Sequence, residues 1–213
     1  MTIAKNIAQI ALEVGAIQIN ARKPFTWASG YKMPIYNDNR LLLGNARHRS
    51  LIAEGYRNLL KKHAIEVGVI AGTATAGIPH ATTLADSLQV PLIYVRSSAK
   101  SHGMGNKIEG ILKKNQRVLV IEDLISTGGS AVNAIKAIRE AGGIVNHCFS
   151  IFSYGFPEAS EKFKDISCQI HSILIFSELL KVAESTKYIS PNEIETLQSW
   201  QNDPFNWKSD DEV

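Results

Sequence analysis

The stretch VLVIEDLISTGGSA, residues 118–131, decides the fold expected of this 213-residue chain. It opens on four apolar residues, the kind of run that is typical of a strand buried on both faces of a parallel sheet. Glu122 and Asp123 follow at the carboxyl end of this strand. The small residues at 126–130 then lead into a helix pattern. Strand, tight turn and helix in this order predict one unit of an α/β fold.

The segments on either side repeat that order. Apolar runs predict further strands at 67–71, 91–95 and 144–154 and a weaker one at 171–176, and helix patterns cover 45–62, 78–88 and 130–141. We therefore expect an α/β fold whose central parallel sheet is flanked by helices. Residues 1–213 should form a single domain, with 45–175 as its core and with 1–44 and 176–213 as a small hood.

The overall charge limits the classes of partner. Lys and Arg number 23 against 20 Asp and Glu, a net charge of +3, which argues against a dedicated nucleic-acid binder. Residues 96–117 hold six Lys or Arg and one acid, a local +5, whereas the tail from 201 to 213 carries −3. The surplus is therefore concentrated in one segment, which suits a small polyanion.

Cellular location is predicted from three features. No apolar run approaches the roughly 20 residues of a membrane helix. The N-terminus reads as an amphipathic helix with Ile3, Ile7, Ile10 and Val14 on one face, not as a signal peptide. Cys148 and Cys168 lie in apolar strands, which predicts buried reduced thiols and a cytoplasmic protein.

The chemistry of residues 122–130 points to a sugar phosphate. Small residues let the backbone wrap round an anion, and the N–H groups at a helix start donate to it. Glu122 and Asp123 would repel that phosphate, but they suit sugar hydroxyls or Mg²⁺ held through water. A plain strand–turn–helix with solvated acids is the alternative. A Walker A loop is excluded, because the segment lacks the Gly-Lys-Ser/Thr ending of that motif.

This string closely resembles the phosphoribosyl pyrophosphate (PRPP) signature of the type I phosphoribosyltransferases. The resemblance implies their fold, with Glu122 and Asp123 on the ribose hydroxyls and the turn on the 5′-phosphate. The residues of the PRPP site implied here are Glu122, Asp123, Leu124, Ile125, Ser126, Thr127, Gly128, Gly129 and Ser130.

A second segment, RSSAKSHGMGNKIEG at 96–110, has cations among glycines and should be mobile without ligand. By composition it could be only a solvated basic loop. It resembles the catalytic loop of the orotate phosphoribosyltransferase family, which reaches the neighbouring subunit's site in a homodimer. The resemblance places Lys100 and His102 on pyrophosphate and Arg96 on a phosphate. Some members of the family have a second lysine directly after the arginine, at the position that Ser97 occupies in this chain.

A third segment, FTWASGYKMPIYNDNR at 25–40, resembles that family's orotate-site motif. Ser29, Lys32, Tyr36 and Arg40 are the candidate orotate ligands, together with Ser126 of the turn. Arg40 could bind the orotate carboxylate in bidentate fashion or pair with an acid such as Asp38. Tyr36 could equally pack or stack on the base. One branch of the family has a lysine at the position that Ala28 occupies in this chain.

The loop GTATAGIP at 72–79 resembles the family's pyrophosphate loop, and its backbone N–H groups could bind pyrophosphate as a nest. Some members have a lysine where this chain has Ala76, and the region SYGFPEA at 153–159 lacks an arginine of one branch. The residues expected to bind PRPP from this loop are Thr73, Ala74, Thr75, Ala76 and Gly77.

Together the segments imply transfer of phosphoribose from PRPP to orotate, a pentosyltransferase reaction of pyrimidine biosynthesis. Lys100, His102 and Asp123 are the implied catalytic residues. Mg²⁺ is the implied cofactor, bound through PRPP and held by Glu122 and Asp123 through water. A purine-using transferase is the nearest alternative, and a non-catalytic PRPP sensor is the alternative of another class. No nucleic acid or membrane partner is expected.

Two groups of aromatic side chains are assigned to structure instead. His147 and His171 lie in strand patterns and are expected to be structural. Trp200, Phe205 and Trp207 are expected to anchor the tail on the rest of the chain.

Overall fold

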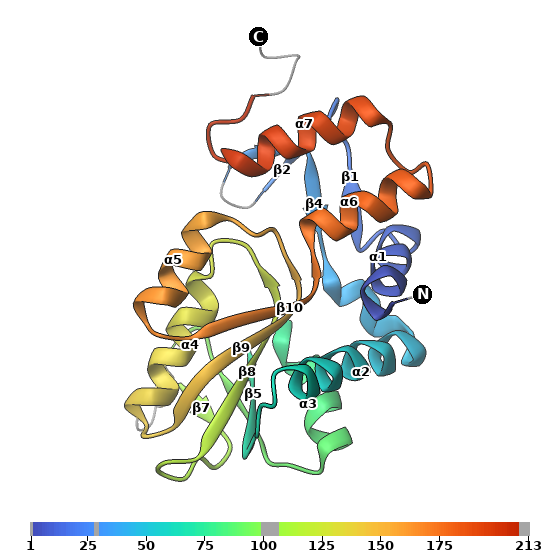
Figure 1. Cartoon of the computed structure of the whole chain (residues 1–213). Helices are drawn as coiled ribbons and strands as arrows, with labels where there is room; N and C mark the ends of the chain where they lie inside the picture. Colours follow the sequence, from blue (N-terminus) through green and yellow to red (C-terminus); the bar gives the residue numbers. More distant parts are fainter. Residues whose placement is uncertain (1, 28–29, 99–106, 209–213) are drawn as a thin grey trace.

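A six-stranded sheet forms the centre of the molecule (Figure 1). The computed structural model describes residues 2–27, 30–98 and 107–208. The strands lie in the order β10-β9-β8-β5-β6-β7. Their bounds are β5 Val69–Thr73, β6 Leu92–Val95, β7 Ile108–Glu109, β8 Arg117–Ile125, β9 Ile144–Ser153 and β10 Gln169–Ile175.

The expected parallel sheet is confirmed, with one difference at its edge. All neighbours pair in parallel except β7, which runs antiparallel to β6. This two-residue strand lies within the polar segment 96–110, where no apolar run marks it. Strand β8 also continues to Ile125, two residues beyond the acids that were predicted to end it.

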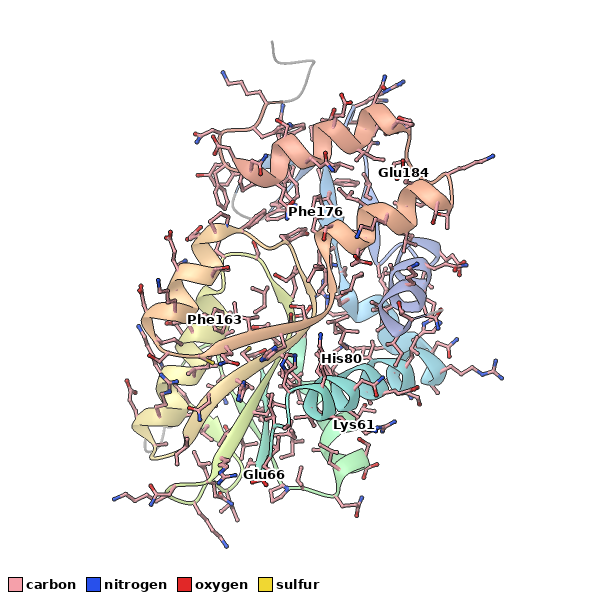
Figure 2. All side chains as sticks on the ribbon, in the orientation of Figure 1. Lys61, Glu66, His80, Phe163, Phe176 and Glu184 are labelled. Atoms are coloured by element: carbon pink, nitrogen blue, oxygen red, sulfur yellow. The ribbon has the colours of Figure 1, made fainter. Side chains whose placement is uncertain are left out.

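Helices cover both faces of the sheet, which explains the unbroken apolar runs of its strands (Figure 1). In β8, Leu119 and Ile121 pack with α1, α2 and α3, whereas Val118 and Val120 face α4 and α5. Figure 2 shows Phe163 on the α5 side and His80 on the α3 side. The helix bounds are α1 Ile3–Glu13, α2 Ala46–Lys62, α3 Gly77–Leu88, α4 Gly129–Glu140 and α5 Pro157–Asp165.

The sequence predicted two of these helices imperfectly. In α1 the predicted apolar face is wrong in part, because Val14 is 39% exposed. The buried stripe is Ile7, Ala8, Ala11 and Leu12, whose small alanines let α1 approach its neighbours closely. Helix α5 was not predicted, since only Ala159 and Phe163 of its nine residues are buried.

A second layer of elements lies above the carboxyl edge of the sheet (Figure 1). Trp200 is fully buried there and packs against the rings of Tyr154 and Phe156. Phe205 contacts Tyr31 edge-on, with ring centroids 5.2 Å apart, so the expected aromatic anchors are confirmed. The elements of this layer are β1 Ile17–Ile19, β2 Phe25–Thr26, β3 Lys32–Met33, β4 Ile35–Asn37, η1 Asn39–Gly44, α6 Phe176–Ser185 and α7 Pro191–Asn202.

Cys148 and Cys168 are free thiols and both are buried, as predicted. Across residues 2–27, 30–98 and 107–208, none of the helices has the length and apolar character needed to cross a bilayer.

Burial of His80 makes the fold sensitive to acid. Its side chain is 2% exposed on α3, and burial lowers its pKa to about 4 from the 6.5 expected in the unfolded chain. The neutral imidazole therefore stabilises the fold above pH 6.5, and that stability is lost as the pH falls towards 4.

Urea unfolding should show that the contribution of His80 to the free energy of unfolding falls by roughly 2 kcal/mol between pH 7 and pH 5. In His80→Gln the acid-induced loss should be smaller by that amount, and an equal loss in both proteins would contradict the assignment.

Candidate active site

The two acids and the proposed pyrophosphate loop lie side by side. Parallel pairing sets Gly72 of β5 beside Ile121 of β8, so both strands end at one edge of the sheet. Glu122 and Asp123 extend β8 at that edge, and the loop after Thr73 begins there too. In open parallel sheets ligands bind at this carboxyl edge.

Glu122 is held inside the protein. Its side chain is 6% exposed, and its Oε1 accepts a 2.6 Å hydrogen bond from Thr73 Oγ1 and a 3.2 Å bond from the Asp123 N–H. Burial raises the pKa of Glu122, and the neighbouring charge of Asp123 raises it further. Burial also raises the pKa of Asp123. Two carboxyl groups this close favour binding of a cation or of hydroxyl donors between them.

The turn after β8 has the backbone of an anion site. Gly128 has φ +76°, and a Cβ there would lie 2.9 Å from the Phe163 ring, so a larger residue is excluded. Helix α4 begins at Gly129, with no acidic residue in its first turn and no side-chain cap on its N–H groups. Free N–H groups at a helix start and the helix dipole both attract anions.

The loop between β5 and α3 is packed closely against the acid strand. A Cβ on Gly77 would lie 2.4 Å from Thr73 Oγ1 and 2.5 Å from the Ile121 carbonyl oxygen. The Ala74–Thr75 peptide bond is cis. Helix α3 starts at Gly77, so a second helix N-terminus lies beside the acids.

Side chains of η1 and α2 bond main-chain atoms at the same edge. Asn39 Nδ2 donates to the Asp123 carbonyl oxygen at 2.9 Å, and Tyr56 Oη donates to that of Glu122 at 3.3 Å. Both hold the end of β8. Neither contact could be predicted from the sequence, since they bond main-chain atoms 84 and 66 residues away.

Arg40 forms the ion pair that was its alternative assignment. Its Nε and Nη2 donate to the two carboxylate oxygens of Asp38 at 2.6 and 2.8 Å. The Arg40 side chain is nevertheless 64% exposed. Its charge opposes the rise in the pKa of Asp123, so Arg40 acts electrostatically on the acid at the end of β8. Tyr36 packs beside Phe25, with ring centroids 5.9 Å apart.

The other candidate residues are more scattered or lie outside the described ranges. Arg96 follows β6 and pairs with Glu109, with Nη1 and Oε1 3.4 Å apart. Lys32 lies exposed on β3. Ser29, Lys100 and His102 lie outside the described residues, so the structure does not place them.

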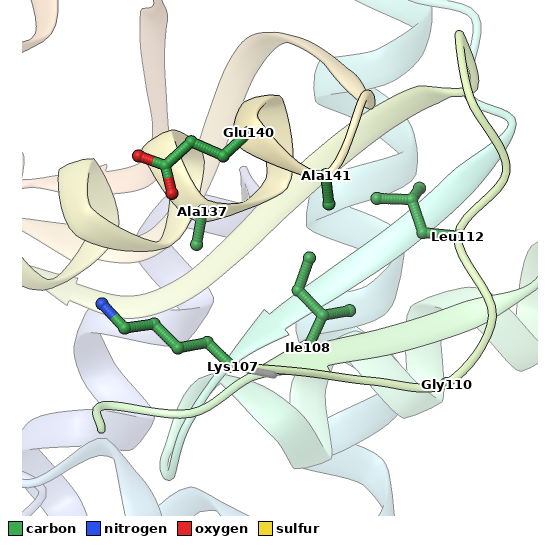
Figure 3. Close-up of a pocket in the computed structure, with 7 residues that line it drawn as sticks. All are labelled: Lys107, Ile108, Gly110, Leu112, Ala137, Glu140 and Ala141. Atoms are coloured by element: carbon green, nitrogen blue, oxygen red, sulfur yellow. The ribbon is translucent and has the colours of Figure 1, made fainter. Parts of the chain in front are cut away.

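The cavity shown in Figure 3 is a different place. It measures about 440 Å³, and Lys107, just before β7, and Glu140 of α4 reach over it. Its α4 residues are at the C-terminal end of the helix, whereas the phosphate turn precedes its start. Ala137, the lining residue nearest the start of α4, comes eight residues after Gly129, which is roughly 12 Å along the helix.

Comparison with known proteins agrees with this geometry. The family described as "Phosphoribosyl transferase domain" matches residues 43–177, so the chain belongs to the phosphoribosyltransferases. Two relatives named orotate phosphoribosyltransferase narrow the class. That of Listeria monocytogenes is 45% identical over 97% of this chain and 99% of the relative. That of Staphylococcus aureus is 46% identical over 94% and 98%.

A solved orotate phosphoribosyltransferase, from Aeropyrum pernix, superposes with a TM-score of 0.74 at 27% identity and covers 86% of this chain and 99% of its own. The chain is a member of the orotate phosphoribosyltransferase family.

Proposed function

We propose that this protein transfers the phosphoribosyl group of PRPP to orotate, giving orotidine 5′-monophosphate and pyrophosphate in pyrimidine biosynthesis. The observation that carries the proposal is the shared edge of β5 and β8, where the buried Glu122 and the half-buried Asp123 lie between the loop after β5 and the turn after β8. PRPP has a ribose between a 5′-phosphate and a pyrophosphate, so its three parts match the three parts of this edge.

Each part of the edge has a role in binding PRPP. Glu122 and Asp123 accept hydrogen bonds from the ribose hydroxyls. The N–H groups and hydroxyls of residues 126–130 hold the 5′-phosphate, and the backbone N–H groups of residues 73–77 hold pyrophosphate. The bond between C1′ and the pyrophosphate oxygen breaks with its electron pair on oxygen. N1 of orotate gives up its proton to water or to the departing pyrophosphate and supplies the electron pair for the new bond to C1′. The chain contributes position and electrostatics to this step.

The two carboxyl groups also fit Mg²⁺ carried by PRPP. Among the described residues no group of three or more His, Cys, Asp or Glu could hold a metal alone. Mg²⁺ commonly takes one or two carboxylates together with substrate phosphates and water. Glu122 and Asp123 would hold it through water, and the ion would neutralise charge on the departing pyrophosphate.

The orotate side of the site lies under the second layer. Arg40 acts electrostatically on Asp123, and Ser126 begins the turn beyond that acid. Tyr36 lies on β4, four residues before Arg40. We assign the orotate carboxylate to Arg40, whose exposed guanidinium can exchange Asp38 for the ligand or contact both. Ser29 and Lys32 complete the set.

We further propose a cytoplasmic homodimer that acts as one domain per subunit. In it the loop of residues 96–110 from one subunit completes the neighbour's site with Lys100, His102 and Arg96. Two cationic side chains there would stabilise charge on pyrophosphate as it leaves.

Lys100→Ala should therefore lower kcat far more than it weakens PRPP binding, because the cation acts on charge that develops in the transition state. We expect kcat to fall by roughly 100-fold, with KM for PRPP changed by a few-fold at most. Steady-state kinetics at saturating orotate measure both. A kcat within about twofold of the wild type would show that the loop is not catalytic.

The proposed function is tested by orotate consumption in the presence of PRPP and Mg²⁺, with hypoxanthine and adenine as competing bases. We expect orotate alone to be used. Use of a purine would favour a purine phosphoribosyltransferase. PRPP binding without turnover of any base would favour a sensor.

A further inference from the structure

We propose that the side chain of Thr73 is a positioning residue, which holds Glu122 in the orientation that receives the ribose of PRPP. The inference rests on the proposed function and extends it, since the PRPP-binding role given above to Thr73 uses only its main chain. Thr73 is the last residue of β5 and Glu122 lies on the adjacent strand β8.

The hydrogen bond between them is short and buried. Thr73 is 2% exposed, and its Oγ1 lies 2.6 Å from Glu122 Oε1 and 3.2 Å from the Ile121 carbonyl oxygen. A hydroxyl has one proton, so the shorter contact to the carboxyl group takes it. A hydrogen bond to a charged acceptor is stronger than a neutral bond to a carbonyl oxygen.

Glu122 needs such a partner because its surroundings are unfavourable to a carboxylate. It is 6% exposed and lies beside Asp123, whose charge repels it. The described part of the chain gives Oε1 two donors, the Thr73 hydroxyl and the Asp123 N–H. Only the first comes from another strand. Without it, Oε1 keeps the 3.2 Å bond from the Asp123 N–H and loses its contact with β5.

The shape of the loop preserves this contact. A Cβ on Gly77 would lie 2.4 Å from Thr73 Oγ1, so glycine is required there to leave room for the hydroxyl. The hydroxyl thereby joins the start of the pyrophosphate loop to the ribose-binding acid. PRPP spans both, so we infer that Thr73 sets the distance between two parts of one substrate.

The test compares Thr73→Val, which keeps the shape and removes the donor, with Thr73→Ser, which keeps the donor. In Thr73→Val we expect KM for PRPP to rise by about 10- to 100-fold, the factor that corresponds to loss of one charged hydrogen bond. KM for orotate should stay within about twofold. Thr73→Ser should keep KM for PRPP within about threefold of the wild type.

Thr82→Val is a matched control, since the Thr82 hydroxyl donates to the Ile78 carbonyl within α3, away from the acids. It should leave both KM values unchanged. If Thr73→Val does not fold, Thr73→Ala is measured by the same criteria. The inference is overturned if KM for PRPP stays within twofold of the wild type, if KM for orotate rises by the same factor, or if Thr73→Ser is as impaired as Thr73→Val.

Calorimetric titration with PRPP and Mg²⁺ separates this inference from the proposed function. An inactive wild-type protein would contradict the function. The Kd for PRPP is measured in Thr73→Val whether or not the wild type is active. A 10-fold rise would support the positioning role of Thr73, and a constant Kd would contradict it.

Discussion

Asp123→Asn should lower kcat/KM for PRPP by about 100- to 1,000-fold. Asp123 is the more exposed acid of the pair, and the substitution keeps its shape but removes the charge that accepts ribose hydroxyls. Two hydrogen bonds to a carboxylate, each near the lower end of the usual range of about 1.5–3 kcal/mol, account for a loss of this size. Initial rates at varied PRPP, with Mg²⁺ and saturating orotate, give the value.

Asp86→Asn is the control for the removal of one negative charge, because Asp86 is exposed on α3 and away from the sheet edge. It should leave kcat/KM unchanged. A tenfold or smaller loss in Asp123→Asn, or an equal loss in both variants, would show that Asp123 does not bind the ribose.

Trp200→Ala should lower the free energy of unfolding by about 3–5 kcal/mol, the usual loss for a buried aromatic residue replaced by alanine. Trp200 is fully buried, and its ring centroid lies 5.5 Å from Tyr154 and 5.4 Å from both Phe156 and Phe176. Its Nε1 also lies 3.0 Å from Met33 Sδ, which ties α7 to the β2–β3 hairpin. The cavity left behind cannot be filled by rings that are already packed against one another.

Urea unfolding followed by circular dichroism measures this loss. Tyr188→Ala is the matched control, since Tyr188 is a neighbouring aromatic residue that is 44% exposed. It should cost less than about 1 kcal/mol. A Trp200→Ala loss below 1.5 kcal/mol would mean that the second layer does not depend on this aromatic cluster.

The sequence predicted the parts of the fold that burial on two faces controls. Val118–Ile121 is a continuous apolar run because both faces of β8 are covered by helices. Strand β7 could not be predicted, because two residues at a sheet edge need no apolar pattern. Helix α5 buries only two side chains, so its sequence reads as polar surface.

The candidate site was predictable where it depends on residue type and order. Two acids after a strand and small residues before a helix are sufficient to predict a sugar phosphate site. The Thr73–Glu122 bond was not predictable, because it joins residues 49 apart through pairing of β5 with β8. The same limit applies to Arg40, for which the sequence allowed either a ligand or Asp38 as partner, and the structure shows the pair with Asp38.

The most direct test of the account is hydrogen–deuterium exchange of the wild-type protein with and without PRPP and Mg²⁺. The central claim is that PRPP binds where β5 and β8 end. We predict slower exchange of the amides of residues 73–77 and 126–130, with the segment 137–141 beside the cavity of Figure 3 unchanged. Protection confined to residues 137–141, or no protection of either loop at saturating PRPP, would contradict the claim.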